Sequence, residues 1–128
     1  MAEITTGVIW IAVVLGAVGS FLVGWLWYSP ILFGKKWAEG NGLGSDDASG
    51  MPFAAMGANF IGLFLMSWFV GVTAVSSALL TVILATVAFT VLAFSGGMFA
   101  KKPTSVLVID AGYWLAAFVV MFIFQMIF

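Results

Sequence analysis

The sequence predicts an all-α, polytopic membrane protein built as a bundle of four transmembrane helices. Sixty-four per cent of its 128 residues are hydrophobic and only 7% are charged, whereas soluble domains carry about 25% charged residues. The charges lie in a few short clusters that divide the chain into apolar stretches. A chain of this length is expected to form one domain, residues 1–128.

Four apolar stretches are long enough to cross a bilayer, which takes about 20 residues. They cover about residues 7–28, 52–72, 77–99 and 104–128. The second and third are expected to form a tight hairpin, because one continuous helix would be roughly 70 Å long against a core of about 30 Å. Residues 34–51 are rich in Gly, Asn, Ser and Asp, a composition typical of a loop.

The lysines predict the orientation of the chain in the membrane. Lys35 and Lys36 lie in the first connection, and Lys101 and Lys102 lie in the third. These two connections are on the same side of a four-helix topology, and the positive-inside rule places that side in the cytoplasm. We therefore expect a cytoplasmic loop at 34–51 and both termini on the non-cytoplasmic side of a multi-pass protein of the inner (cytoplasmic) membrane.

Two stripes of small residues at four-residue spacing predict close contacts between helices. They are Gly16, Ser20 and Gly24 in the first helix, and Ala54, Ala58 and Gly62 in the second. Such a seam would lie either within the bundle or between protomers. The alternative is that Gly and Ala are simply common in membrane helices.

Composition excludes several classes of function. The chain has no cysteine and no histidine, so thiol chemistry, imidazole bases and the usual transition-metal ligands are absent. Its net charge of −1 provides no basic patch for nucleic acid. We predict no catalytic residue, no cofactor and no metal site. The expected partners are the lipid bilayer and either other membrane protein subunits or a second copy of the chain.

Asp110 is the only charged residue well inside an expected span, roughly 10 Å along the helix from its cytoplasmic end. An ionisable group at that depth is a candidate functional site. Asn59, Tyr28 and Tyr113 are expected in the same half of the bundle, so the four residues define a candidate intramembrane polar cluster. Asp110 either binds a proton or cation, or is a structural lock that bonds to Asn59, a tyrosine hydroxyl or a nearby lysine. We favour the lock, because a lone carboxylate without a second acid is poorly equipped for catalysis.

The end of the first helix predicts an elbow. The residue before a proline avoids the α region, so Ser29-Pro30 should kink or stop the helix. Residues 31–33 would then run along the membrane interface. Gly34 would turn the chain, and Trp37 would anchor it at the interface.

Two motifs carry a resemblance to a known family. The stretch Trp27-Tyr28-Ser29-Pro30, followed by Leu32-Phe33-Gly34-Lys35 and Trp37, resembles the signature of the domain of unknown function 1761 family. Ile109-Asp110-Ala111-Gly112-Tyr113 resembles that family's second motif, at the start of its last helix. The positions that match these motifs are Tyr28, Ser29, Pro30, Phe33, Gly34, Trp37, Asp110, Gly112 and Tyr113.

The resemblance covers essentially the whole chain and implies a small bacterial integral membrane protein with the architecture described above. It implies no activity. The connection at residues 96–102 departs from the family pattern, because it lacks the more polar run with Asn and Glu expected there.

Three functions remain open from the sequence. We favour a non-enzymatic accessory or scaffold subunit that packs against itself or a larger membrane complex. The alternative is a small homo-oligomeric transporter or channel with Asp110 as its intramembrane proton or cation site. An enzyme acting on a lipid or quinone is the least supported, for want of catalytic groups.

Overall fold

The computed structural model describes residues 2–41 and 53–128, and within these ranges every regular element is a helix. Four helices are long and apolar enough to cross a membrane: α2 (Trp10–Trp27), α4 (Phe53–Val75), α5 (Leu79–Phe99) and α6 (Thr104–Ile127). Two short helices flank α2, namely α1 (Ala2–Thr5) and α3 (Gly34–Gly40). The predicted all-helical class with four candidate membrane spans is confirmed.

The observed helices differ from the expected ones at several points. The first long helix begins at Trp10 rather than near residue 7, because Gly7 adopts a left-handed φ of 77° and separates α1 from α2. Helix α4 continues to Val75, past the expected end at residue 72. Helix α3 occupies the start of the expected loop, since most of its residues favour helix. Residues 42–51 of that loop lie outside the described residues.

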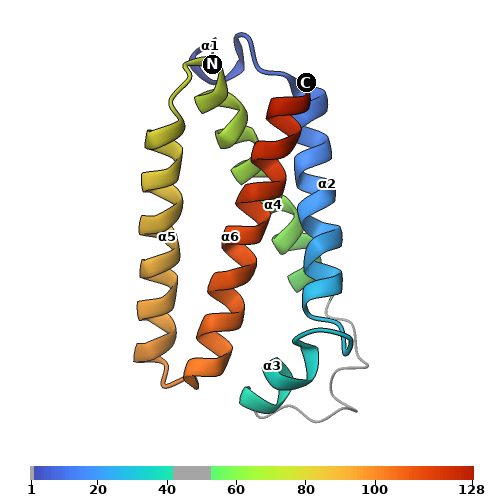
Figure 1. Ribbon diagram of the computed structural model, residues 1–128, viewed down its shortest axis with the longest axis vertical. Coiled ribbons are helices and arrows are strands. Elements are labelled where there is room, and N and C mark those ends of the chain that lie inside the picture. The colour runs from blue at the N-terminus through green and yellow to red at the C-terminus, as the bar shows by residue number, and fades with distance from the viewer. Residues whose placement is uncertain (1, 42–52) are drawn as a thin grey trace.

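The long helices run roughly side by side, with α6 between α2 and α5 and with α4 behind it (Figure 1). Helix α6 contacts α2 most extensively, and α2 also packs along α4. Helix α5 makes most of its contacts with α6 and few with α4. The start and the end of the chain lie at one end of the molecule, and α3 lies at the other (Figure 1).

The first stripe of small residues lies inside the chain. Gly16, Ser20 and Gly24 are all buried. A Cβ atom at Gly16 would lie 2.5 Å from Ser67 Oγ and 3.3 Å from Met121 Cα, so α4 and α6 both approach the backbone of α2 here. The Ser67 hydroxyl donates a hydrogen bond of 2.7 Å to the Val13 carbonyl, which joins α4 to α2.

The second stripe does not form a seam within the chain. Ala54, Ala58 and Gly62 are exposed on α4, and a Cβ atom at Gly62 would meet no atom of the described chain within 4 Å. The two stripes therefore have different surroundings although their spacing is the same. Spacing alone does not tell which face of a helix is buried.

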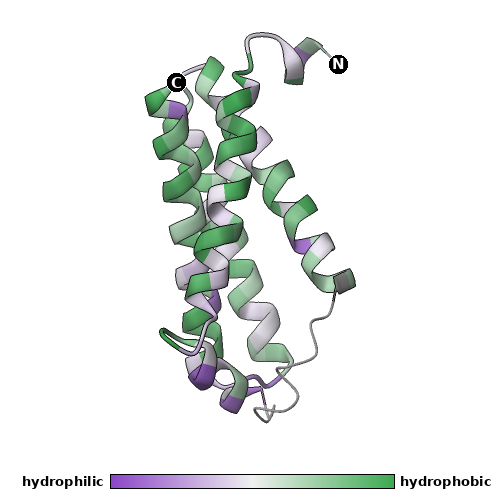
Figure 2. Ribbon diagram, turned by 90° about the vertical axis from the view of Figure 1, so that its right-hand side faces the viewer, coloured by the Kyte–Doolittle hydropathy of each residue, from purple (hydrophilic) through white to green (hydrophobic). Residues whose placement is uncertain are grey.

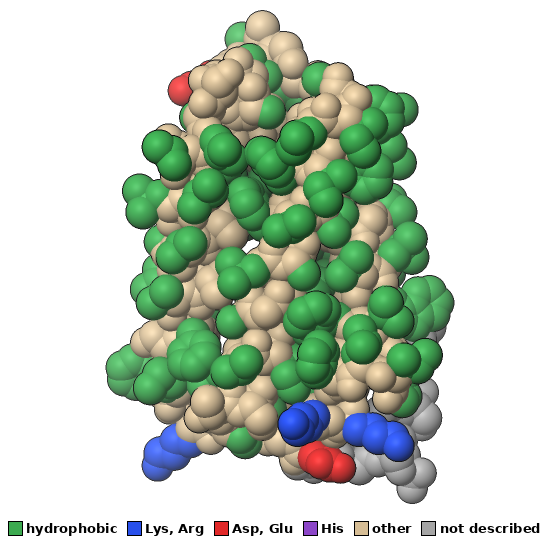
Figure 3. All heavy atoms as spheres, in the orientation of Figure 1, with side chains coloured by type: hydrophobic (Ala, Val, Ile, Leu, Met, Phe, Trp, Pro, Cys, Tyr) green, Lys and Arg blue, Asp and Glu red, His purple; other side chains and the backbone are tan. Residues whose placement is uncertain are grey.

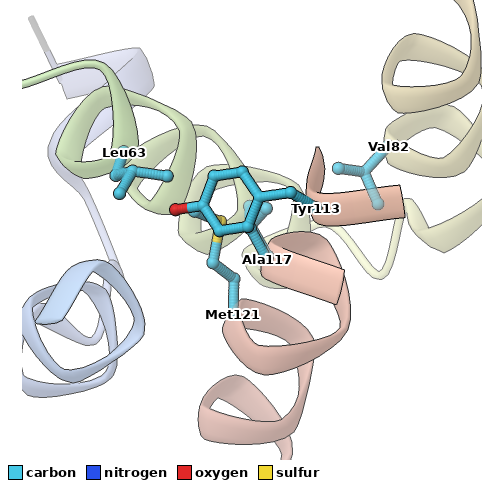
Figure 4. Close-up of a cluster of buried hydrophobic side chains, with 6 residues drawn as sticks. Leu63, Val82, Tyr113, Ala117 and Met121 are labelled. Carbon is cyan, nitrogen blue, oxygen red and sulfur yellow. The ribbon is translucent and has the colours of Figure 1, made fainter. Parts of the chain in front are cut away.

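Apolar side chains form both the interior and most of the surface. Tyr113, Ala117 and Met121 of α6 group beside Leu63 of α4, with Val82 nearby on α5 (Figure 4). The long helices are hydrophobic along most of their length (Figure 2), and many of their large apolar side chains are exposed. On the face shown in Figure 3, the lysines gather at the end where α3 and the α5–α6 turn lie. This distribution is what a bilayer requires of a spanning protein.

The close approach of α4 and α6 at Gly16 predicts that alanine is destabilising there but is tolerated at Gly57. Gly16→Ala should lower the free energy of unfolding in detergent by about 1–3 kcal/mol, because the new methyl group would collide with Ser67 Oγ, which is held by its hydrogen bond to the Val13 carbonyl, and would crowd the backbone of α6. Gly57→Ala should be neutral or slightly stabilising, since its Cβ would meet nothing within 4 Å. Equal effects of the two changes would contradict the packing described here.

Candidate functional site

The first motif forms a compact elbow after α2. The helix ends at Trp27, and the chain then turns so that Phe33 N–H donates to the Trp27 carbonyl at 3.0 Å. The Gly34 N–H donates to the Ser29 carbonyl at 2.9 Å. A Cβ atom at Gly34 would collide with the carbonyl oxygen of Tyr28, so only glycine fits at this turn. The elbow thus directs α3 back toward α6.

Asp110 joins this elbow to α6. The Tyr28 hydroxyl donates to Asp110 Oδ1 at 2.5 Å, and Trp37 Nε1 donates to the same oxygen at 3.0 Å. The two aromatic rings meet edge to face, with centroids 5.5 Å apart. One carboxylate oxygen therefore holds the end of α2, the helix α3 and the first part of α6 together.

The two family-like motifs also interlock through neighbouring residues. Trp27 Nε1 donates to the Ile109 carbonyl at 3.0 Å. A Cβ atom at Gly112 would lie 2.9 Å from the indole ring of Trp27, so this glycine lets the ring lie against α6. The motifs are far apart in sequence, yet they contact each other along one side of α6.

The other members of the expected cluster lie next to Asp110 rather than on it. The Tyr113 ring packs against Tyr28 with centroids 5.6 Å apart, and its hydroxyl donates to the Ser20 carbonyl at 2.9 Å. Tyr28, Asn59 and Tyr113 line one cavity of about 280 Å³. The four predicted residues thus lie together, with Asn59 beside Tyr113 and Tyr28 bonded to Asp110.

Two contacts in this site were not predicted from the sequence. Trp37 was expected to anchor the chain at the interface, whereas it donates directly to Asp110. Ser20 was expected only as a small residue of the helix seam, yet its carbonyl accepts the Tyr113 hydroxyl. The repeated tryptophans of the first motif could have indicated the Trp37–Asp110 contact, because a buried indole N–H requires a hydrogen-bond acceptor. No ion pair to a lysine is present at Asp110 among the described residues.

The electrostatics of the site favour a fixed hydrogen bond over a mobile proton at Tyr28. Burial, and then the hydrogen bond to Asp110, raise the pKa of Tyr28 well above its ordinary value. Tyr28 therefore remains a protonated donor. In the part of the chain that the structure describes, no three acidic, histidine or cysteine residues come together as a metal site.

Asp110 also borders a second cavity, on the side of α6 that faces α5. This cavity has a volume of about 280 Å³ and is lined by residues of α5, the α5–α6 turn and α6. Lys102 is among them, as are Gly96 and Gly97. The carboxylate is thus held from one side and borders an open space on the other.

Comparison with known proteins gives one family. A family model described as "Protein of unknown function (DUF1761)" matches residues 11–126, a range that includes both motifs and all four long helices in large part. No curated protein and no solved structure matches the chain.

The indole donor at Asp110 yields a direct test. Trp37→Phe keeps an aromatic ring against Tyr28 but removes the N–H, so it should lower the free energy of unfolding by about 1–2 kcal/mol. Denaturant unfolding in mild detergent would measure the change. Trp25→Phe is the matched control, because Trp25 is 65% exposed and should tolerate the change. Equal stability of the two variants would show that the Trp37–Asp110 bond contributes nothing.

Proposed function

The chain belongs to the DUF1761 family, whose description assigns no activity. From the geometry of the chain we propose a non-enzymatic accessory or scaffold role in a membrane. In this role it packs against itself or against a larger membrane protein complex. Four helices long and apolar enough to cross a bilayer support the membrane setting.

The use of Asp110 is the observation that carries the proposal. An ionisable group within a membrane span is costly and marks either a functional path or a structural tie. Oδ1 of Asp110 accepts two hydrogen bonds, one from Tyr28 at the end of α2 and one from Trp37 in α3. The polar atoms of the two motifs bond to each other, which supports a role in fixing the shape of the molecule.

The outer surface supports association with other membrane components. Large apolar side chains are exposed along α5, among them Leu80, Leu84 and Leu92 at 81%, 71% and 72%. In a bilayer this surface contacts lipid or the helices of a partner. The exposed small residues of α4 add a face that a second helix can approach closely.

We place the lysine end of the molecule in the cytoplasm and both termini outside, in the inner membrane of a bacterium. Lys35 and Lys36 lie in α3, and Lys101 and Lys102 lie between α5 and α6. The positive-inside rule supports this orientation.

Single cysteines test the orientation cleanly, because the chain has none of its own. Thr6→Cys should react with a membrane-impermeant maleimide in intact cells. Glu39→Cys, in α3, should react only after the cells are permeabilised. Both changes keep all four lysines, and the reverse pattern of labelling would overturn the orientation.

Transport remains the second candidate function, and one observation favours it. Asp110 borders the cavity of about 280 Å³ between α5 and α6, together with Lys102. A carboxylate and a cation at an opening are groups that a proton or cation path can use. Since four helices enclose little volume, a pore would require several copies of the chain.

Gentle detergent extraction at native expression distinguishes the two candidates. The accessory role predicts recovery in fixed stoichiometry with other membrane subunits, by size analysis and mass spectrometry, whereas a homo-oligomer fits both candidates and is then decided by the measurement of ion flux. Asp110→Asn, which keeps an acceptor oxygen, should then leave the assembly intact. Recovery as a lone monomer would contradict the accessory role. Loss of ion flux in a folded Asp110→Asn variant would establish transport instead.

A further inference from the structure

A cavity of about 290 Å³ lies between α4, α5 and α6 and is separate from the bonds that hold Asp110. Its aromatic walls are Phe89, Trp114 and Phe118, and the small residues Ala58 and Gly62 line its α4 side. No ionisable residue is among the described residues that line it. The volume is near the lower end of the range for small-molecule sites, roughly 300–1,000 Å³.

Thr86 gives this cavity an unpaired hydroxyl. Thr86 lines the cavity and is only 4% exposed, and its Oγ1 atom has no hydrogen-bond partner within the described chain. A threonine in a helix normally bonds to the carbonyl one turn earlier. Thr90, on the same face of α5, does so, with Oγ1 donating to the Thr86 carbonyl at 2.8 Å. A buried hydroxyl left without a partner is costly, so this one is a candidate ligand contact.

The depth of Thr86 restricts which molecules can meet it. Thr86 lies about 10 Å along α5 from Leu79, at 1.5 Å per residue, and farther from Phe99. In a hydrocarbon core about 30 Å thick, that depth is well below the region of phospholipid head groups. The ligand must therefore carry its polar atom deep in the bilayer and without charge.

We propose that the α4–α5–α6 cavity binds an uncharged ring compound of the quinone class, with one ring carbonyl accepting a hydrogen bond from the Thr86 hydroxyl. The aromatic walls suit a flat ring, and the volume admits one ring rather than a whole lipid. An apolar tail would leave past Ala58 and Gly62 toward the surrounding lipid. The proposal concerns binding alone, and it requires that no second helix cover the α4 face at Ala58 and Gly62, so it excludes self-association through that face.

The test uses the full chain in nanodiscs and decylbenzoquinone as the probe. Binding is followed by saturable quenching of tryptophan fluorescence, with empty nanodiscs correcting for partitioning. We expect one saturable site, and decylbenzene, which lacks the carbonyls, should not compete for it. Thr86→Val preserves the shape and removes the hydroxyl, so it should weaken binding about fivefold.

Two further variants keep the test decisive. Thr90→Val is the matched control one turn away, outside this cavity, and should leave affinity within about twofold of the parent chain. Ala58→Phe changes an exposed residue, so the chain should still fold while the cavity is filled and binding is lost. Unsaturable quenching would overturn the proposal, as would an affinity equal to that of the parent chain in both Thr86→Val and Ala58→Phe. Disulfide-linked dimers through Ala58→Cys in native membranes would also overturn it, because a second copy would then cover the cavity.

Discussion

At the lysine end of the molecule, three segments meet at a single carboxylate oxygen. The hydroxyl of Tyr28 and the indole of Trp37 both donate to Oδ1 of Asp110. Hydrogen bonds to a charged group in a medium of low dielectric are stronger than those in water, and an unpaired carboxylate there is costly. The end of α2, the elbow and α3 therefore depend on α6 for their position, and α6 depends on them to satisfy its only charged side chain.

Further hydrogen bonds join α2 to α6 deeper in the molecule. Ser20 Oγ donates to the Ala117 carbonyl at 3.2 Å, and Tyr113 donates back to the Ser20 carbonyl at 2.9 Å. Such bonds between helices replace the hydrophobic effect, which gives little drive for helix association inside lipid. Helix α5 has no hydrogen bond of this kind within the described residues, and cavities lie along its inner face. The molecule thus combines a tightly joined set of helices with one loosely attached helix.

The helical class and the four candidate spans could be predicted from the sequence, because long apolar runs divided by short polar segments are compatible with few folds other than a set of membrane-spanning helices. It also singled out Asp110 and Tyr28, since depth along a helix can be counted from residue number. Which face of α4 is buried could not be predicted, because its stripe of small residues has the same spacing as that of α2. The role of Trp37 was missed because it depends on the direction in which the elbow turns, and this turn is set by Gly34 and several backbone hydrogen bonds. The shift of the first helix to Trp10 was missed for a similar reason, since it depends on the left-handed conformation of Gly7.

A double-mutant cycle on Tyr28 and Asp110 tests the central claim most directly. Tyr28→Phe, Asp110→Leu and the combined variant would be compared with the parent chain by reversible unfolding in the same detergent. If the carboxylate holds the elbow to α6, the coupling free energy should be about 1.5 kcal/mol or more, as for hydrogen bonds to charged groups. A coupling near zero, with the two single changes simply adding, would contradict the account.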